Sequence, residues 1–229
     1  MILRELLASF KPGFDPIPLN EKIRSGFAAF SGILVLGFVL RLLPGEAGYH
    51  LAIFASMAAA AVLLYAAPHS PMAQPWPLVG GNLVSGLIGW CWSLAIADPV
   101  LAAACAVGSA VLVMYLLNCL HPPGGATAMI MVLGAELFHQ HGWLWAASTV
   151  LANTLLSLLL ALTINKLLPG RHYPAQHAAR KVVAVDGEIA ATDIEWALSQ
   201  MDGVIDANED DLLEICRLAH ERARKRHSG

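Results

Sequence analysis

The residues with the most distinctive chemistry form the motif His121-Pro122-Pro123-Gly124-Gly125-Ala126-Thr127-Ala128. It lies between two apolar runs, 100–117 and 129–138. Because proline lacks an N–H and clashes with the preceding turn, the two prolines predict that no helix continues through the motif. A broken helix at membrane depth is tolerated where it is buried in protein or lines a cavity. The motif is therefore predicted to be a site.

A small anion is the ligand that this motif would suit. The backbone N–H groups of Gly124, Gly125, Ala126 and Thr127 are expected to be free at the start of a helix, with the positive end of its dipole facing the ligand. Thr127 would add its hydroxyl or else cap its own helix. His121 changes charge near neutral pH and is the expected proton carrier, unless a backbone carbonyl simply holds its ring.

Other polar residues extend the candidate site. Asn82 and Asn153 lie on apolar segments, where they would contact the substrate or, as we favour, bond helix to helix. His69 precedes Asn82 in a connection expected to face the same side as His121. Glu136 is a second proton-relay candidate, although its place near the membrane boundary also fits plain solvation.

No pattern in the chain indicates an enzyme. The sequence has no Ser/His/Asp or HExxH arrangement, and its four cysteines show no CxxC spacing. His139 and His141 are too sparse for a metal site. We therefore predict no catalytic residue, no metal and no cofactor, and rank an intramembrane enzyme using His121 last.

The composition places most of the chain in a lipid bilayer. Hydrophobic residues make up 57% and charged residues 14%, whereas a soluble domain carries about 25% charged residues. Between Leu42 and Asn165 there is no Lys and no Arg. The chain has no basic face of the kind that binds nucleic acid.

Six apolar segments are expected, at 25–43, 50–67, 78–97, 99–118, 124–138 and 143–168. A full crossing needs about 20 residues, so the second and fifth are short, and four or six crossings remain open. Basic residues flank the first and last segments, which predicts that both termini are cytoplasmic and that the number of crossings is even.

A faint repeat favours six segments. Residues 56–62 resemble 123–129, and Asn82 with Ser85 resembles Asn153 with Ser157. The predicted fold is an all-α polytopic transmembrane bundle of two inverted three-segment repeats with short or broken helices. We divide the chain into an N-terminal cytoplasmic segment (1–23), a transmembrane domain (24–168) and a small helical cytoplasmic C-terminal region (169–229).

Four ordered blocks resemble the HPP family of integral membrane proteins: residues 22–26, 68–76 and 79–82, and the His121 motif. The resemblance covers most of 20–168. It implies a four-spanning protein, in some members with an added C-terminal regulatory domain, and nitrite transport in plastid and cyanobacterial members. Where the family often has Gly-Ala-Ser-Ala, residues 58–61 here are all alanine and offer no hydroxyl.

The leading hypothesis is an integral membrane transporter or channel for a small inorganic anion, nitrite favoured, in a bacterial inner membrane. The alternative is a membrane-anchored sensor or regulatory protein whose C-terminal region carries the output. Because so small a unit would need a partner to enclose a path, a homodimer is expected.

Overall fold

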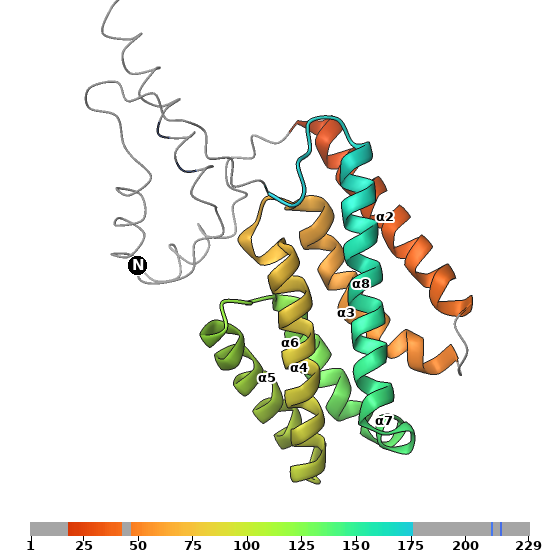
Figure 1. Cartoon of the computed structure of the whole chain (residues 1–229), viewed down its shortest axis with the longest axis vertical. Helices are drawn as coiled ribbons and strands as arrows, with labels where there is room; N and C mark the ends of the chain where they lie inside the picture. The colour runs from red at the N-terminus through yellow and green to blue at the C-terminus, as the bar shows by residue number, and fades with distance from the viewer. Residues whose placement is uncertain (1–17, 43–46, 176–211, 213–215, 217–229) are drawn as a thin grey trace, which may run out of the picture.

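The computed structural model describes residues 18–42 and 47–175, together with Leu212 and Cys216, and these residues form helices and their connections (Figure 1). The elements are α2 (Leu19–Leu42), α3 (Ala47–Ala66), η1 (Pro71–Ala73), α4 (Pro75–Ala95), α5 (Pro99–Leu116), α6 (Pro122–Leu133), α7 (Ala135–His141) and α8 (Trp143–Leu167). The predicted all-α polytopic bundle is confirmed. The helices expected in the C-terminal region lie outside the described residues, apart from Leu212 and Cys216, which are helical.

Within the described residues, four helices are long and apolar enough to cross a bilayer: α2, α4, α5 and α8. The predicted fifth segment is divided at Gly134 into α6 and α7. The 12 residues of α6 rise about 18 Å, well short of the roughly 30 Å of a bilayer core. The fifth segment is therefore shorter than the spanning helices, as expected. The expectation of a short second segment was wrong, because α3 has 20 residues, about the length of a full crossing.

Prolines mark the starts of three helices. Pro75, Pro99 and Pro122 each occupy the first turn of α4, α5 or α6, where an N–H would have no intrahelical partner. At α5, the Asp98 side chain also accepts a hydrogen bond from Leu101 N at 2.8 Å. The sequence thus sets these helix starts locally.

The break before the His121 motif has a different cause from the one expected. Helix α5 ends at Leu116, Asn118 has a positive φ of 51°, and Cys119 N donates to Met114 O at 2.9 Å. The chain then reverses, and α6 runs back beside α5 (Figure 1). The two prolines follow this reversal, so they start α6 and do not interrupt a helix shared with α5.

The helices alternate in direction between two ends of the bundle (Figure 1). The η1 end carries η1, the start of α2 and the end of α8; the opposite, α7 end carries α7. Helices α2, α4 and α6 run from the η1 end towards the α7 end, and α3, α5 and α8 run back. Six helices therefore run along the bundle in alternating directions, although the 12 residues of α6 extend along only part of it.

The packing has an internal symmetry. Helix α2 packs on α3 and α8, as α5 packs on α6 and α4. Helix α3 packs on α8 as α6 packs on α4, while α3 meets α6 and α4 meets α8. Exchanging α2, α3 and α4 with α5, α6 and α8 leaves this set of contacts unchanged, and each exchanged pair runs in opposite directions (Figure 1).

Helices α4 and α6 approach closely because glycines line the contact. A Cβ on Gly89 would lie 2.4 Å from Ala128 O, and a Cβ on Gly81 would lie 2.7 Å from His121 Cβ. Such contacts forbid a larger residue at either position. This close packing holds the His121 motif against α4.

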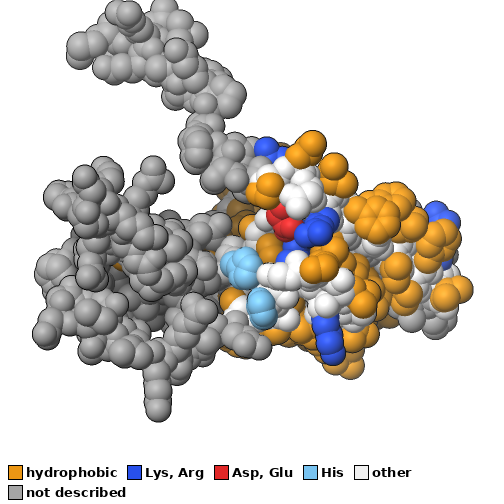
Figure 2. All heavy atoms as spheres, turned by 90° about the horizontal axis from the view of Figure 1, so that it is seen from above, with side chains coloured by type: hydrophobic (Ala, Val, Ile, Leu, Met, Phe, Trp, Pro, Cys, Tyr) orange, Lys and Arg blue, Asp and Glu red, His pale blue; other side chains and the backbone are white. Residues whose placement is uncertain are grey.

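The outer surface suits a lipid environment. Large apolar side chains are exposed along the spanning helices, among them Phe27, Phe38, Leu112, Leu144 and Leu159. Seen from the η1 end, acidic, basic and histidine side chains gather together amid this apolar surface (Figure 2).

Candidate functional site

His121 lies immediately before α6 and is completely buried. Its Nδ1 lies 2.9 Å from Met72 O in η1. Since a carbonyl oxygen can only accept, Nδ1 carries the proton, and Nε2 of the neutral ring presents a lone pair. Nε2 has no hydrogen-bond partner among the described residues. This contact confirms that the connection after α3 meets the His121 motif, and it leaves one reactive nitrogen free.

Burial changes the acid–base behaviour of this histidine, which lies in the connection outside the spanning helices. Desolvation lowers the pKa of His121 to about 4, while the bond to Met72 acts in the opposite direction and is the weaker effect. The resting ring is therefore neutral at pH 7, and protonation needs a stabilising partner.

A chain of hydrogen bonds joins α3, α6 and α4 near the middle of the bundle. Ser56 Oγ lies 2.7 Å from Thr127 Oγ1, and Thr127 Oγ1 donates to Asn82 Oδ1 at 2.6 Å. Asn82 Nδ2 in turn donates to Leu78 O at 2.8 Å. Ser56, Asn82 and Thr127 are all fully buried.

Proton counting gives this chain a direction. Each hydroxyl has one hydrogen, and Thr127 uses its hydrogen on Asn82. The 2.7 Å contact is then made by the Ser56 hydroxyl donating to Thr127, with Pro123 O at 3.0 Å as a competing acceptor. The expected helix-to-helix role of Asn82 is confirmed, and Thr127 joins it across the α4–α6 contact.

The start of α6 offers fewer free backbone N–H groups than the predicted anion site assumed. Its first two residues are Pro122 and Pro123, which have no N–H, and Gly124 N donates to His121 O at 2.8 Å. Ala126 and Thr127 follow in α6, where a backbone N–H ordinarily bonds to the carbonyl four residues earlier. The expectation of a free N–H on Gly124 was therefore wrong, because α6 starts earlier than expected. The expected ligand role of Gly125, Ala126 and Thr127 stays a prediction.

Gly124 has a packing role instead. A Cβ at this position would lie 2.8 Å from Ser85 Oγ and 3.0 Å from Met114 Sδ. Gly125 and Ala126 are half-buried and are not among the polar contacts of the cluster.

Asn153 holds the second buried polar atom without a partner. Its Nδ2 donates to Thr149 O in its own helix at 2.9 Å, while Oδ1 has no partner among the described residues. Gly86 of α4 faces Val150 of the antiparallel α8. Asn82 lies one turn before Gly86 in α4, and Asn153 lies about one turn after Val150 in α8. Because the two helices are antiparallel, both asparagines lie on the η1 side of this contact, at the same level of the bundle.

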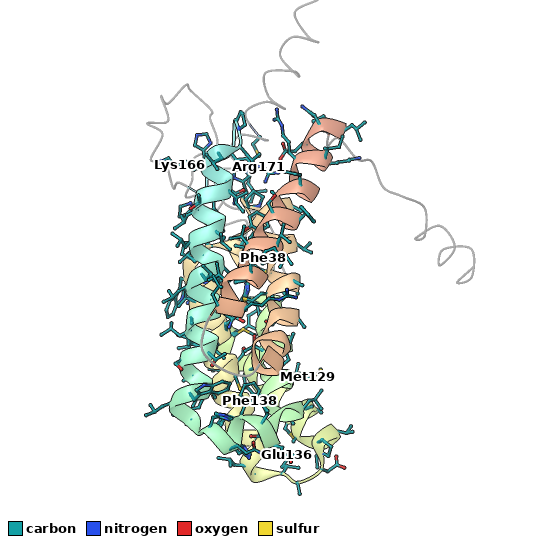
Figure 3. The ribbon with its side chains drawn as sticks, turned by 90° about the vertical axis from the view of Figure 1, so that its right-hand side faces the viewer. Phe38, Met129, Glu136, Phe138, Lys166 and Arg171 are labelled. Atoms are coloured by element: carbon teal, nitrogen blue, oxygen red, sulfur yellow. The ribbon has the colours of Figure 1, made fainter. Side chains whose placement is uncertain are left out.

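Two predicted site residues lie elsewhere. His69 is exposed at the η1 end, where it lines a cavity of about 410 Å³. Glu136 is exposed in α7, at the end of the bundle opposite Arg171 and Lys166 (Figure 3). The structure therefore does not join Glu136 to His121, and solvation explains this carboxylate. Among the described residues, no three His, Cys, Asp or Glu side chains gather as a metal site would require.

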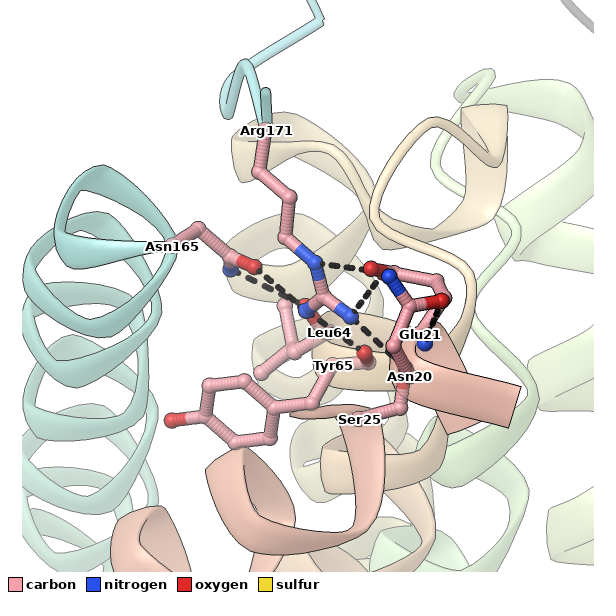
Figure 4. Close-up of polar contacts among 7 residues, drawn as sticks. All are labelled: Asn20, Glu21, Ser25, Leu64, Tyr65, Asn165 and Arg171. Atoms are coloured by element: carbon pink, nitrogen blue, oxygen red, sulfur yellow. Dashed lines mark hydrogen bonds and ion pairs between the residues drawn. The ribbon is translucent and has the colours of Figure 1, made fainter. Parts of the chain in front are cut away.

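Sequence reasoning missed two groups. Ser56 was noticed only as part of a repeat, although it is the one hydroxyl residue in the alanine-rich 55–61. Arg171 was used only as one of the basic residues after the last apolar segment that predict the orientation of the chain in the membrane. Its guanidinium donates to Glu21 and Ser25 of α2, to Tyr65 O of α3 and to Asn165 Oδ1 of α8 (Figure 4).

These features define a polytopic α-helical membrane protein with a buried, uncharged polar centre. Residues 15–174 match the family described as HPP, transmembrane region, and the chain belongs to this family. Among curated proteins it is similar to two transmembrane proteins of Dictyostelium discoideum. One is 36% identical over 176 residues, which cover 75% of this chain and 61% of that protein. The other is 38% identical over 160 residues, or 68% and 51% of the two chains.

The chain thus spans between about half and three fifths of the length of these relatives. No solved structure matches it.

Proposed function

We propose that this protein is a transporter or channel for a small inorganic anion, with nitrite the favoured substrate, and that a proton on His121 accompanies the anion. The observation that carries this proposal is the buried Nε2 of His121, which has no partner among the described residues while Nδ1 is fixed on Met72 O. Buried polar atoms normally have partners, and an exception calls for an explanation.

Charge balance supports the proton. An isolated anion in a low-dielectric interior is very costly, and residues 42–165 contain no Lys or Arg to neutralise it. The start of α6 offers no free N–H at its prolines. Protonation of Nε2 would create both a positive charge and an N–H donor where the lone pair now is. Anion and proton would each stabilise the other, so we expect them to bind together.

The packing symmetry supports a transport function. We interpret α2, α3 and α4 as one repeat and α5, α6 and α8 as its inverted counterpart, because exchanging them preserves the helix contacts. In secondary transporters, sites lie at the interface between inverted repeats near the bilayer midplane. Here Ser56 of α3 meets Pro123 and Thr127 of α6 at the contact between the two halves.

We further propose a bacterial inner-membrane location with the η1 end cytoplasmic, and a homodimeric assembly. Light scattering in detergent would measure the assembly. The charged residues at the η1 end, such as Lys166 and Arg171, support this orientation.

Nitrite flux into proteoliposomes tests the function. Wild-type protein should carry nitrite above the leak of protein-free liposomes, faster when an inward proton gradient is imposed. His121→Gln should abolish the effect of the gradient, whereas Glu136→Gln, at the opposite end, should retain it. Nitrite flux equal to the protein-free leak would refute the proposal.

A further inference from the structure

The short helix η1 lies between His121 and the η1 end of the bundle. Met72 O accepts the bond from His121 Nδ1, and the neighbouring Ala73 O accepts one from the Tyr173 hydroxyl at 2.9 Å. Ala73 is fully buried. One side of η1 therefore holds the histidine, while its next carbonyl is held by a segment that follows α8.

That segment, residues 171–175, contacts the connection around η1 at a second point. Ala175 N donates to Gln74 Oε1 at 2.8 Å. The Gln74 amide nitrogen donates to Pro68 O and Ser70 O, at 3.0 and 2.9 Å. Gln74 thus links residues 171–175 to the connection 68–74. Helix η1 is held in place by hydrogen bonds within this connection and by hydrogen bonds from the chain after α8.

Arg171 anchors the same segment to the bundle. Its side chain is 5% exposed, and it pairs with Glu21 while also binding Ser25, Tyr65 O and Asn165 (Figure 4). These partners belong to α2, α3 and α8. A buried, multiply bonded guanidinium of this kind holds its backbone in a defined position.

A cavity lies on the outer side of this assembly. It has a volume of about 410 Å³, and its lining includes Glu21, His69, Ser70 and Arg171. Ser70 is the N-cap of η1, and His121 contacts η1 two residues later at Met72. The cavity therefore reaches η1 without reaching the buried imidazole.

We propose that residues 171–175 are a latch that holds η1 as a gate between this cavity and His121. The purpose of this gate, to admit the anion to His121, rests on the proposed function. Opening requires the bonds of Tyr173 and Gln74 to break, so that η1 moves away from His121.

Burial raises the pKa of the Tyr173 phenol, and nearby Tyr65 adds to the shift. The hydroxyl is therefore protonated, and remains a donor to Ala73 O, throughout the physiological range. The latch has no pH switch of its own at Tyr173.

The test uses a native thiol and does not depend on transport. Cys119 is completely buried, two residues before His121. In full-length protein with Cys91, Cys105 and Cys216 replaced by alanine, the rate of maleimide labelling reports how often this site opens. Tyr173→Phe removes one latch bond and should speed labelling of Cys119 about fivefold. Arg171→Gln removes several bonds and should speed it more than tenfold.

Two controls separate gating from general loosening. Tyr115→Phe removes a hydroxyl from an exposed tyrosine of α5 and should leave the Cys119 rate unchanged. Ala146→Cys, in the same background with Cys119→Ser, places a reporter at a fully buried position near the α7 end, and its rate should not respond to either latch variant.

An unchanged Cys119 rate in both latch variants would overturn the gate, as would a parallel rise at position 146. If labelling responds as expected while nitrite flux is absent, the gate stands and the assignment of the anion fails.

Discussion

At the scale of single residues, the centre of this protein is a set of uncharged groups whose hydrogen bonds are almost completely used. Ser56, Thr127 and Asn82 satisfy one another across three helices. His121 Nε2 and Asn153 Oδ1 are the buried exceptions among the described residues. Both are acceptors, so the groups left open suit a proton or a proton-bearing ligand.

The Ser56–Thr127–Asn82 chain should contribute measurably to stability. Thr127→Val keeps the shape but removes the donor to Asn82 Oδ1 and the acceptor for Ser56. Ser56 can still donate to Pro123 O, but Asn82 Oδ1 is left buried and unpaired, which costs about 1–3 kcal/mol. Denaturation in detergent should show this loss of unfolding free energy. Thr163→Val, at an exposed threonine bonded only within its own helix, should cost far less; equal losses would contradict the account.

His121 should also make the ligand-free protein less stable in acid. Its pKa falls from 6.5 to about 4 on folding, so the unfolded state binds a proton more readily. Stability from this group is complete above pH 6.5 and is lost as the pH falls towards 4, by a total on the order of 3 kcal/mol. Thermal unfolding without added anion should therefore show a smaller acid loss in His121→Gln than in wild type.

The exposed His172→Gln is the matched control for this effect and should follow the wild type. If His121→Gln loses as much stability as wild type between pH 6.5 and 4, His121 is not the buried neutral residue described above.

At the scale of elements, the short helices place the chemistry. Helix α6 starts at Pro122 because α5 has already ended and the chain has reversed at Asn118. Because Gly81 and Gly89 have no side chains, α6 packs closely against α4. The hydrogen bond between Thr127 and Asn82 at this contact is buried from solvent.

The reversal at Asn118 should depend on its positive φ of 51°. Asn118→Val places a β-branched side chain in a conformation that costs roughly 1–2 kcal/mol for residues other than glycine, so melting temperature and folded yield should fall. Asn118→Gly permits the same conformation and should retain both. The reverse order of stability would show that the reversal is set elsewhere.

At the scale of the whole molecule, the sequence was enough to predict six apolar segments, their order and the short fifth segment, whereas α3 proved longer than expected, at 20 residues. Hydrophobicity and proline positions determine these features locally. The contact of His121 with Met72 required the tertiary fold, because 49 residues separate the two. The free backbone N–H expected at Gly124 is absent. Helix α6 starts two residues earlier than expected, at Pro122, and Gly124 N donates to His121 O.

The same limit applies to Arg171. A basic residue after the last apolar segment predicts orientation, but nothing in its neighbourhood predicts that Glu21, 150 residues away, will pair with it. Long-range polar contacts of this kind arise from how helices pack, and no local periodicity encodes them.

The alternation of helix directions makes a topological prediction. Single cysteines introduced at His69 and His172, both exposed at the η1 end, should react with a membrane-impermeant maleimide from the same side of the membrane. A cysteine at Glu136, exposed at the α7 end, should react only from the other side. Reaction of all three from one side would contradict this alternation.

The central claim is that the anion binds together with a proton on His121, and the pH dependence of nitrite affinity tests it most directly. Titration calorimetry in detergent at pH 6, 7 and 8 should show affinity rising about tenfold for each unit that the pH falls, since one proton is taken up per anion. His121→Gln should remove this dependence, while His172→Gln should retain it. A wild-type affinity that is independent of pH, or a full dependence in His121→Gln, would contradict the claim.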